Sequence, residues 1–334
     1  MLKVTATVAM TLSLLLAGCN RTDSGNNAGN EAQQSLAEAV ACDRDCLLSA
    51  TDQYLAALVA HDPAAAPMAA NVAFVENVKR IQPGDGLWKS ISGGPAEFRI
   101  AVPDVDQQQV GWLGVVQREG EPVMLAMRLK FENGRITEAE HLVTEPVSGQ
   151  MDHLQTPRPG LLATVPAADR LPHDKLIAIG ATYYDALDDN DGSKMTFAPD
   201  CLRRENGITT AGEGTRSPPN IAPTESPVAT DCKGQLDSQS FTYIDRIDNR
   251  RMIAADPVTG LAMGLSHFHH PMTNLPYQVI HSDGSTSERN KQNMPFEPFD
   301  MPAAHIFKIS SDGAVHEIEA AGFKAPYNSP TGWE

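Results

Sequence analysis

Histidines near the end of the chain are the residues best suited to do chemistry. His267, His269 and His270 stand in one apolar run, and His305 stands in a second. On a β-strand, His267 and His269 would project from one face and His270 from the other. An imidazole in a half-apolar pocket can exchange a proton near neutral pH. We therefore predict that His305 is an acid–base catalyst that works with His267 and His269, or with His270. The alternative is that all of them are hydrogen-bonded or solvent-facing side chains at strand ends.

The same histidines could bind a metal ion, but the sequence argues against it. His267-x-His269-His270 resembles the double-histidine strand of a cupin, in which a glutamate follows about four residues later. Thr273 and Asn274 occupy those positions here. We therefore expect no metal ion and no cofactor.

Other polar residues could assist such a site. Glu205 could be an acid or base if it is partly buried, and Asn206 could bind substrate beside it. The recurrence of Glu-Asn at positions 76–77 favours a structural role for this pair, in which the carboxylate accepts from backbone N–H groups. Arg251 could hold a substrate carboxylate, or it could pair with an aspartate of the same domain. Tyr184 could offer its hydroxyl to a cavity.

The composition excludes several classes of protein. The chain has 334 residues, 41% of them hydrophobic, and a net charge of -16. This is a globular composition, and the acidic balance argues against nucleic acid or anionic lipid headgroups as partners. The sequence has no Gly-x-Ser-x-Gly elbow, phosphate loop or dinucleotide glycine fingerprint. Serine hydrolase, nucleotide and nicotinamide chemistries are therefore disfavoured.

The first residues predict a lipid-anchored protein. Lys3 precedes an apolar run that is too short for a stable membrane span and ends in Leu-Ala-Gly-Cys19, which resembles a lipobox. We expect residues 1–18 to be a signal peptide, Cys19 to carry the lipid, and residues 19–36 to form a flexible tether. The alternative is an ordinary signal peptide. With Asn20 after the cysteine, we expect the periplasmic face of the outer membrane, with membrane contact through the lipid alone.

The other cysteines predict disulfide bonds. If Cys19 carries lipid, Cys42, Cys46, Cys201 and Cys232 remain, and an oxidising compartment would join them in two bonds. Three pairings are possible. A Cys201–Cys232 bond would close a loop rich in Pro, Ser and Thr, and a Cys42–Cys46 bond would then span one turn near a helix start.

Periodicity predicts the elements that must position these residues. Apolar residues at helical spacing predict helices over residues 43–60 and 173–188. Alternation over residues 123–131 predicts a strand with one buried face, and Asn133-Gly134 predicts a hairpin turn after it. Each half is thus a helix followed by hairpin-connected strands, an order that predicts an α+β fold with helices on one face of a curved antiparallel sheet.

Short segments recur in the two halves. Glu76-Asn77 with a following Gly-x-Gly matches Glu205-Asn206 with a following Gly-x-Gly, which predicts an internal duplication. We place the first domain at residues 37–146, a proline-rich linker at 147–171 and the second domain at 172–334. An insertion at 271–300 in the second copy would form a lid, or a surface or dimer loop. We expect no comparable polar cluster in the first half, which would then be a structural or docking domain.

The element order and the repeated Glu-Asn segments resemble the SnoaL-like, nuclear-transport-factor-2-like superfamily of cone-shaped α+β domains, and the resemblance covers both halves. In the second half it also rests on motif residues, namely Arg250-Arg251, Asp256-x3-Gly260, Phe268-x-His270-Pro271, Ala304-His305-Ile306-Phe307-Lys308, Glu317-Ile318-Glu319 and Pro326-Tyr327-x2-Pro330-x-Gly332-Trp333. The resemblance implies a cone whose interior is lined by one face of each strand. Two positions depart from it, because we expect an acidic residue in such relatives where His269 and His305 stand here. The superfamily includes dehydratases, isomerases, hydrolases and binding domains, so the fold does not select an activity.

Two functions are consistent with these observations. The first is a cofactor-free lyase, isomerase or hydratase that acts on a small organic or sugar-derived compound by histidine-based proton transfer. The second is a non-catalytic lipoprotein for ligand binding or assembly, in which side chains fill the cone. The expected partners are a small molecule and, for a homodimer, a second copy of the chain.

Overall fold

The computed structural model describes residues 41–147, 151–215 and 231–334. The predicted signal peptide at 1–18, the tether at 19–36 and the lipidation site Cys19 lie outside these residues. Within the described part of the chain, no helix is both long and apolar enough to cross a membrane.

The first half is a helix followed by a seven-stranded sheet. The pairing order is β2-β1-β7-β6-β5-β3, with β4 also on β5. All its strand pairs are antiparallel except β1 with β7. The elements are α1 (Arg44–Val59), η1 (Pro63–Ala65), β1 (Met68–Glu76), β2 (Lys79–Ile81), α2 (Leu87–Ser90), β3 (Ile91–Gly93), β4 (Arg99–Asp104), β5 (Gln109–Arg118), β6 (Glu121–Glu132) and β7 (Arg135–Thr144).

The second half repeats this connectivity. Its sheet has the pairing order β10-β11-β14-β15-β8-β9, and β8 is parallel to β15 just as β1 is parallel to β7. The connecting segment holds η2 (Met151–Leu154), α3 (Pro159–Leu162) and η3 (Ala167–Asp169). The sheet elements follow as α4 (His173–Asp188), η4 (Gly192–Lys194), β8 (Phe197–Glu205), β9 (Ile208–Ala211), α5 (Cys232–Asp237), β10 (Arg246–Asp256), β11 (Leu261–His270), β14 (Phe299–Ile309), β15 (Val315–Gly322) and β16 (Ala325–Pro326).

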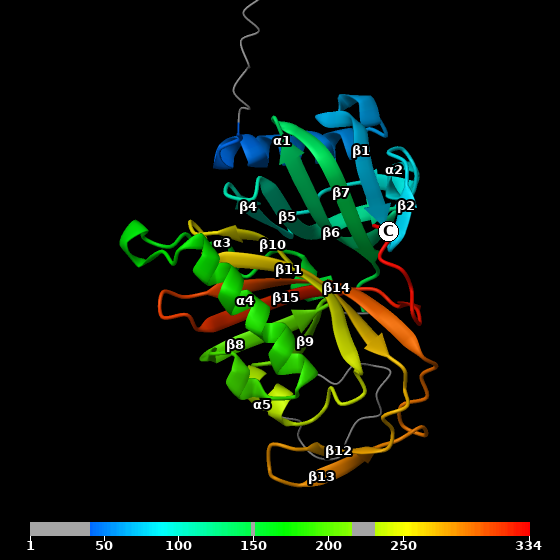
Figure 1. The fold of residues 1–334 in the computed structure, drawn as a ribbon, viewed down its shortest axis with the longest axis vertical. Coiled ribbons are helices and arrows are strands. Elements are labelled where there is room, and N and C mark those ends of the chain that lie inside the picture. Colours follow the sequence, from blue (N-terminus) through cyan, green and yellow to red (C-terminus); the bar gives the residue numbers. More distant parts are fainter. Residues whose placement is uncertain (1–40, 148–150, 216–230) are drawn as a thin grey trace, which may run out of the picture. The chain divides into compact units, whose positions relative to one another are not determined.

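The insertion between β11 and β14 forms a small sheet of its own. It consists of β12 (Tyr277–Ile280) and β13 (Thr286–Arg289), which pair with each other as an antiparallel hairpin. Figure 1 shows α1 on the first curved sheet, α4 on the second, and this hairpin as a separate element. The predicted α+β class, with a helix packed on each curved sheet, is confirmed.

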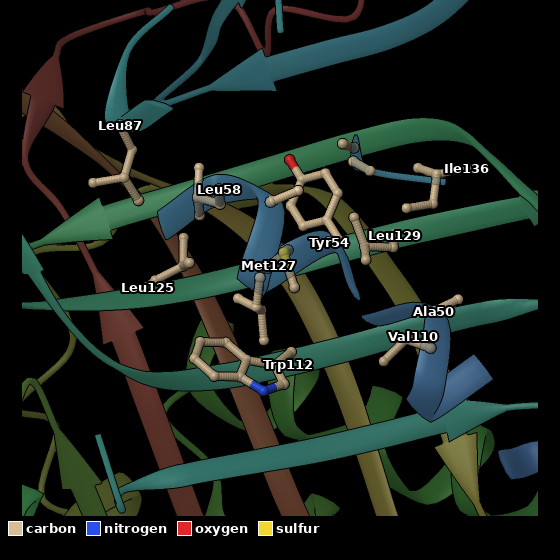
Figure 2. Packing of buried hydrophobic residues seen from close by; sticks show 14 of the residues in the cluster. Ala50, Tyr54, Leu58, Leu87, Val110, Trp112, Leu125, Met127, Leu129 and Ile136 are labelled. Carbon is tan, nitrogen blue, oxygen red and sulfur yellow. The ribbon is translucent and has the colours of Figure 1, made fainter. Parts of the chain in front are cut away.

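Strand β6 shows how the first core forms. Alternate residues Leu125, Met127 and Leu129 pack under Tyr54 of α1, as Figure 2 shows. The prediction of one buried face is wrong, because the intervening residues Met124 and Ala126 are also fully buried. They belong to a second core that the two sheets share. Its members include Ile100, Leu113, Met124 and Ala126 from the first sheet and Ile253, Met263, Leu265 and Ile306 from the second.

Polar contacts also join the two halves. Arg44 of α1 pairs with buried Asp256 of β10 at 2.9 Å. Asp104 at the end of β4 accepts from the backbone N–H of Ala255 and contacts the ring of His173 at 2.7 Å. Both sheets accordingly belong to one compact unit over Ala39–Glu334.

The two expected disulfides are present. Cys42 is bonded to Cys46 at the start of α1, and Cys201 of β8 is bonded to Cys232 of α5. The second bond ties the sheet to the helix across 31 residues of sequence.

Candidate functional site

The strand register divides the histidines between two faces of the second sheet. His305 of β14 lies opposite Gly264 of β11, so His305 shares a face with the even-numbered residues of β11, including His270. His267 and His269 lie on the other face. His305 contacts the rings of α4, whereas His267 lines a small cavity next to residues of the first sheet. Of the two predicted partnerships, the structure therefore leaves only that of His305 with His270 on one face.

His305 is enclosed by aromatic rings. The rings of Tyr183, Tyr184, Phe268 and Phe307 all have centroids between 5.2 and 6.1 Å from its own. Burial lowers the pKa of His305 to about 3, and the positive charge of Arg203 acts in the same direction. The imidazole is therefore neutral at physiological pH. Its Nδ1 has no hydrogen-bond partner among the residues that the structure describes.

The ring of Tyr184 packs edge-on against that of His305, with centroids 5.7 Å apart. It fits over Gly264, where a Cβ atom would come within 2.4 Å of the hydroxyl oxygen. Ser266, two residues further along β11, offers this hydroxyl a side-chain hydrogen bond. Burial raises the pKa of Tyr184 well above its usual value, so this phenol does not ionise near neutral pH. The interior thus holds His305 and Tyr184 as neutral polar groups.

A buried arginine connects the helix to the predicted acid Glu205. Arg203 of β8 is 5% exposed and donates to the Tyr183 hydroxyl at 2.7 Å. It also donates to Thr210 at 2.6 Å and to a Glu205 carboxylate oxygen at 2.6 Å. The side chain of Glu205 remains 27% exposed. The guanidinium thus holds one oxygen of the Glu205 carboxylate at the end of β8. The other carboxylate oxygen stays available.

Asn206 has a fully used side chain. Its amide donates to the carbonyl of Gly322 and accepts from the N–H of Gly322, each within 3.0 Å. Asn77 makes the same two bonds to Val143 in the first half. Both asparagines have a positive φ, near 45°, which Asn tolerates better than most residues. The repeated Glu-Asn segment therefore ends strand β1 and strand β8 in the same way.

Aromatic residues lie near the pair of Arg203 and Glu205, and Phe241 is one of them, because the Arg203 guanidinium lies 5.8 Å from its ring centroid. Tyr243 is half-buried, and its ring lies 5.1 Å from that of His270. Burial raises the pKa of Tyr243, and the negative charge of Glu205 adds to this. Tyr277 of β12 and Arg289 of β13 both donate to the carbonyl of Ser240. The inserted hairpin thus brings its own polar and aromatic groups to this end; Phe241 and Met301 are also half-buried there.

His270 belongs to this end of the cone but is held as a neutral ring. It stacks on Phe299 with centroids 4.2 Å apart, and burial lowers its pKa to about 4. Sequence reasoning included Glu205 and His270 but not Tyr243, Tyr277 or Arg289. The only sequence signal for them was the aromatic and basic content of the insertion and of the segment before β10.

The opposite face of the sheet carries a second polar cluster. His267 and His269 have parallel rings 4.8 Å apart, and both contact the carboxylate of Asp300 on β14. All three residues are at most 6% exposed. Asp248 of β10 lies 3.3 Å from the Nε2 atom of His269.

Arg251 is engaged by the first half of the chain. Its two terminal nitrogens donate to both oxygens of Glu140 on β7, at 2.9 and 2.8 Å. Burial would raise the pKa of Glu140, but Arg251 and Arg128 outweigh it and hold the pKa below its usual value. Arg251 was expected to hold a substrate carboxylate in a bidentate pair. In the structure it holds the carboxylate of Glu140, a residue of this chain, in that way.

The first half has a buried polar cluster that sequence analysis missed. His141 of β7 is fully buried, and its Nε2 lies 3.0 Å from the Tyr54 hydroxyl. Its Nδ1 lies 3.4 Å from Glu76, whose carboxylate also accepts from the N–H of Leu87. The expectation of no comparable polar cluster in this half is wrong. Tyr54, His141 and Glu76 form the same kind of chain from helix to Glu-Asn segment as Tyr183, Arg203 and Glu205.

Two of the hollows among the described residues lie outside the cone interior. The first lies between the sheets beside His267, Arg251 and Glu140, and has a volume of about 20 Å³, enough for one water-sized sphere. The second is an open groove of about 580 Å³ between the connecting segment and the second sheet. Its wall includes Lys308, which donates to two backbone carbonyls, and the pair of partly exposed His316 with exposed Asp200.

Comparisons with known proteins give one family match. Residues 169–322 match a family model described as a domain of unknown function (DUF8021). No curated protein matches the chain. A crystal structure described as a candidate polyketide cyclase from Silicibacter sp. TM1040 aligns with 46% of this chain and 91% of its own, at 14% identity and a TM-score of 0.28. The second half of this chain is thus similar to a family whose function is not assigned.

Proposed function

We propose that this chain is an extracytoplasmic, lipid-anchored protein that binds a small organic ligand at the open end of its second cone. The ligand would lie against the half-buried rings of Tyr243 and Phe241, with Glu205 as its hydrogen-bond acceptor. Flat or sugar-like rings are the class that suits such a surface, because they stack on aromatic faces while their polar edges bond to a carboxylate.

One observation carries this proposal. Arg203 is buried and donates hydrogen bonds to Tyr183 and Thr210. It also holds Glu205 from the protein interior, while the Glu205 side chain remains 27% exposed. A carboxylate that is fixed on one side and open on the other is prepared to accept a hydrogen bond without a further loss of side-chain freedom. The hairpin β12–β13 supplies Tyr277 and Arg289 at the same end.

Binding is favoured over histidine-based catalysis for an electrostatic reason. A general base works best when its pKa lies near the working pH. His305 and His270 have pKa values of about 3 and about 4, so each is a weak base that remains neutral at pH 7. A lyase or isomerase that relies on these imidazoles would lack its acid.

The anchoring part of the proposal rests on the lipobox pattern at Cys19 and on the disulfides, since such bonds persist in oxidising compartments. Incorporation of a labelled fatty acid by the intact chain tests it. We expect labelling of the wild type and none of Cys19→Ser. Equal labelling of both proteins, or of neither, would refute the lipid anchor.

A thermal-shift panel of monosaccharides, hydroxy acids and aromatic carboxylates tests the binding site. We expect at least one class to raise the melting temperature of the wild type, with the shift lost in Glu205→Gln and Tyr243→Leu. His316→Ala, in the outer groove, is the control and should respond like the wild type. A stabilising compound that loses its effect in His316→Ala but keeps it in both cone variants would place the site elsewhere and contradict the proposal.

A further inference from the structure

The cluster of His267, His269 and Asp300 has the composition of a metal site. One ligand atom from each residue can be chosen such that all lie within 4.8 Å of one another. The residues are 3%, 6% and 0% exposed, respectively. Two imidazoles and one carboxylate form a donor set that binds divalent transition metals in many unrelated proteins.

The fold fixes these three side chains independently of any ion. His267 and His269 are two residues apart on β11, and so project from one face of the sheet. Asp300 stands directly opposite His269 on the neighbouring strand β14. The backbone N–H of Ser329 donates to Asp300 Oδ2 at 2.8 Å, which orients the carboxylate. The donor atoms are therefore positioned by a strand register and a backbone hydrogen bond.

The geometry between His269 and Asp300 is unusual for a simple ion pair. Nδ1 of His269 lies 2.8 Å from Oδ1 of Asp300, within hydrogen-bonding distance. Within the part of the chain that the structure describes, the two atoms do not form a hydrogen bond with each other, and neither has another hydrogen-bond partner. Buried polar atoms are seldom left in this state. Two such atoms that are close but not aimed at each other can both be satisfied by a third atom that they share.

The surroundings suit a cation. Asp248 lies 3.3 Å from Nε2 of His269, the ring nitrogen that would not face the ion. A carboxylate in that position orients a ligating histidine and increases its basicity. Asp300 and Asp248 together bring two negative charges, which matches a divalent ion held by neutral imidazoles.

From these observations, we propose that His267, His269 and Asp300 bind one divalent transition-metal ion, with Zn²⁺ as the preferred ion and Asp248 as the orienting carboxylate. Three protein ligands leave a fourth position open on a tetrahedral ion. The cavity of about 20 Å³ that His267 lines is beside this cluster and has room for one small ligand atom. The carboxylate is that of Asp300 on the neighbouring strand β14. A sequence pattern that requires a glutamate just after the histidines therefore does not detect it.

This site is independent of the ligand site in the cone, because the two lie on opposite faces of the sheet. The competing explanation is that His269 bridges Asp300 and Asp248 through these two contacts alone, without any metal ion. That explanation predicts no zinc binding by these residues.

Zinc titration of the untagged, disulfide-bonded protein tests the proposal, after chelator treatment and in competition with a chromophoric zinc indicator. We expect one equivalent of Zn²⁺ to bind. We expect affinity to fall at least 100-fold in His269→Ala and Asp300→Asn, and about 10-fold in Asp248→Asn. The matched control His316→Ala removes an exposed histidine that also pairs with an aspartate, and should bind like the wild type.

Co²⁺ substitution in the wild type provides a readout that needs no variant to fold. Visible absorption bands of a four- or five-coordinate ion should appear and saturate at one equivalent, and Zn²⁺ should abolish them. The proposal is overturned if the wild type binds no stoichiometric Zn²⁺. It is also overturned if folded His269→Ala and Asp300→Asn, checked by circular dichroism, bind as tightly as the wild type.

Discussion

At the scale of single residues, the environment of each histidine decides its chemistry more than its position in the sequence does. His305 sits among four aromatic rings and stays neutral, whereas His269 lies between two carboxylates. The two residues are on neighbouring strands, yet they face opposite sides of the same sheet. A search that counts histidines cannot separate these cases, because the separation depends on strand register.

The depressed pKa of His305 predicts a specific acid sensitivity. In the unfolded chain this group has a pKa near its usual 6.5, and in the folded protein the value is about 3. Between these two pH values the unfolded chain binds a proton on His305 and the folded protein does not. The free energy of unfolding is therefore unaffected by this group well above pH 6.5, and it decreases as the pH falls below that value. From pH 7 to pH 5 we expect a loss of about 2 kcal/mol from this residue alone.

Urea unfolding of the wild type and of His305→Gln at both pH values measures this contribution. The neutral substitution should reduce the acid-induced loss of unfolding free energy by that amount, although His270 still contributes in both proteins. An identical pH dependence for the two proteins would show that His305 is accessible and titrates normally.

At the scale of elements, the same device ends the first strand of each sheet. The amides of Asn77 and Asn206 each bond to both backbone groups of one residue on the parallel neighbouring strand. This explains a sequence repeat by backbone hydrogen bonding, without any function. The link between helix and Glu-Asn segment differs, because the first half uses His141 of the neighbouring strand β7 and the second half uses Arg203 of β8 itself.

Asn77→Ala and Asn206→Ala should therefore destabilise the protein by similar amounts. Each loses two hydrogen bonds and leaves a partly buried backbone N–H without its partner, which costs about 1–3 kcal/mol. Chemical denaturation measures both, and Asn206→Asp, which can still accept from the Gly322 N–H, is the graded control. If Asn206→Ala left stability unchanged while Asn77→Ala reduced it, the two segments would not be equivalent.

The two disulfides should contribute different amounts to the free energy of unfolding. Loss of Cys201–Cys232, which spans 31 residues, should cost about 3–4 kcal/mol by the loop-entropy relation, against about 2 kcal/mol for Cys42–Cys46, which spans 4. Double Cys→Ser variants of each pair, compared by denaturation, check the order. A larger loss on removing Cys42–Cys46 would contradict it.

At the scale of the whole molecule, the two sheets are joined by a shared apolar core and by buried ion pairs. Arg251 donates to Glu140, which is only 7% exposed, whereas the adjacent Arg250 pairs with the more exposed Asp185 and Asp188. Arg251→Met leaves a buried carboxylate with Arg128 as its remaining cationic partner and should cost about 3 kcal/mol. Arg250→Met is the matched control and should cost at most about 1 kcal/mol. Comparable losses of unfolding free energy in the two variants, measured by denaturation, would contradict a larger stabilising role for the pair of Arg251 and Glu140.

The parts of the structure that the sequence predicts are those with local causes. The alternation over residues 123–131 and the Asn133-Gly134 turn predicted the hairpin of β6 and β7, because period-two patterning and turn chemistry act over a few residues. Helix 173–188 was predicted with its observed bounds for the same reason.

The parts that the sequence does not predict depend on distant partners. The second buried face of β6 is covered by a sheet that starts many residues later. Glu140 and Arg251 are 111 positions apart, and His267 and Asp300 are 33 apart. These pairs follow from strand register and sheet packing, neither of which can be derived from spacing along one chain.

The most direct test of the proposed ligand site is methyl NMR of the protein labelled at its methionines. Met301 lies on the same face of β14 as His305 and packs in the same clusters as Tyr243, and Met127 lies in the core of the first half. On titration with a stabilising sugar or aromatic carboxylate from the panel, we predict that the Met301 methyl resonance shifts and that the Met127 resonance does not. A Met301 resonance that stays fixed while the compound saturates the protein would contradict the account.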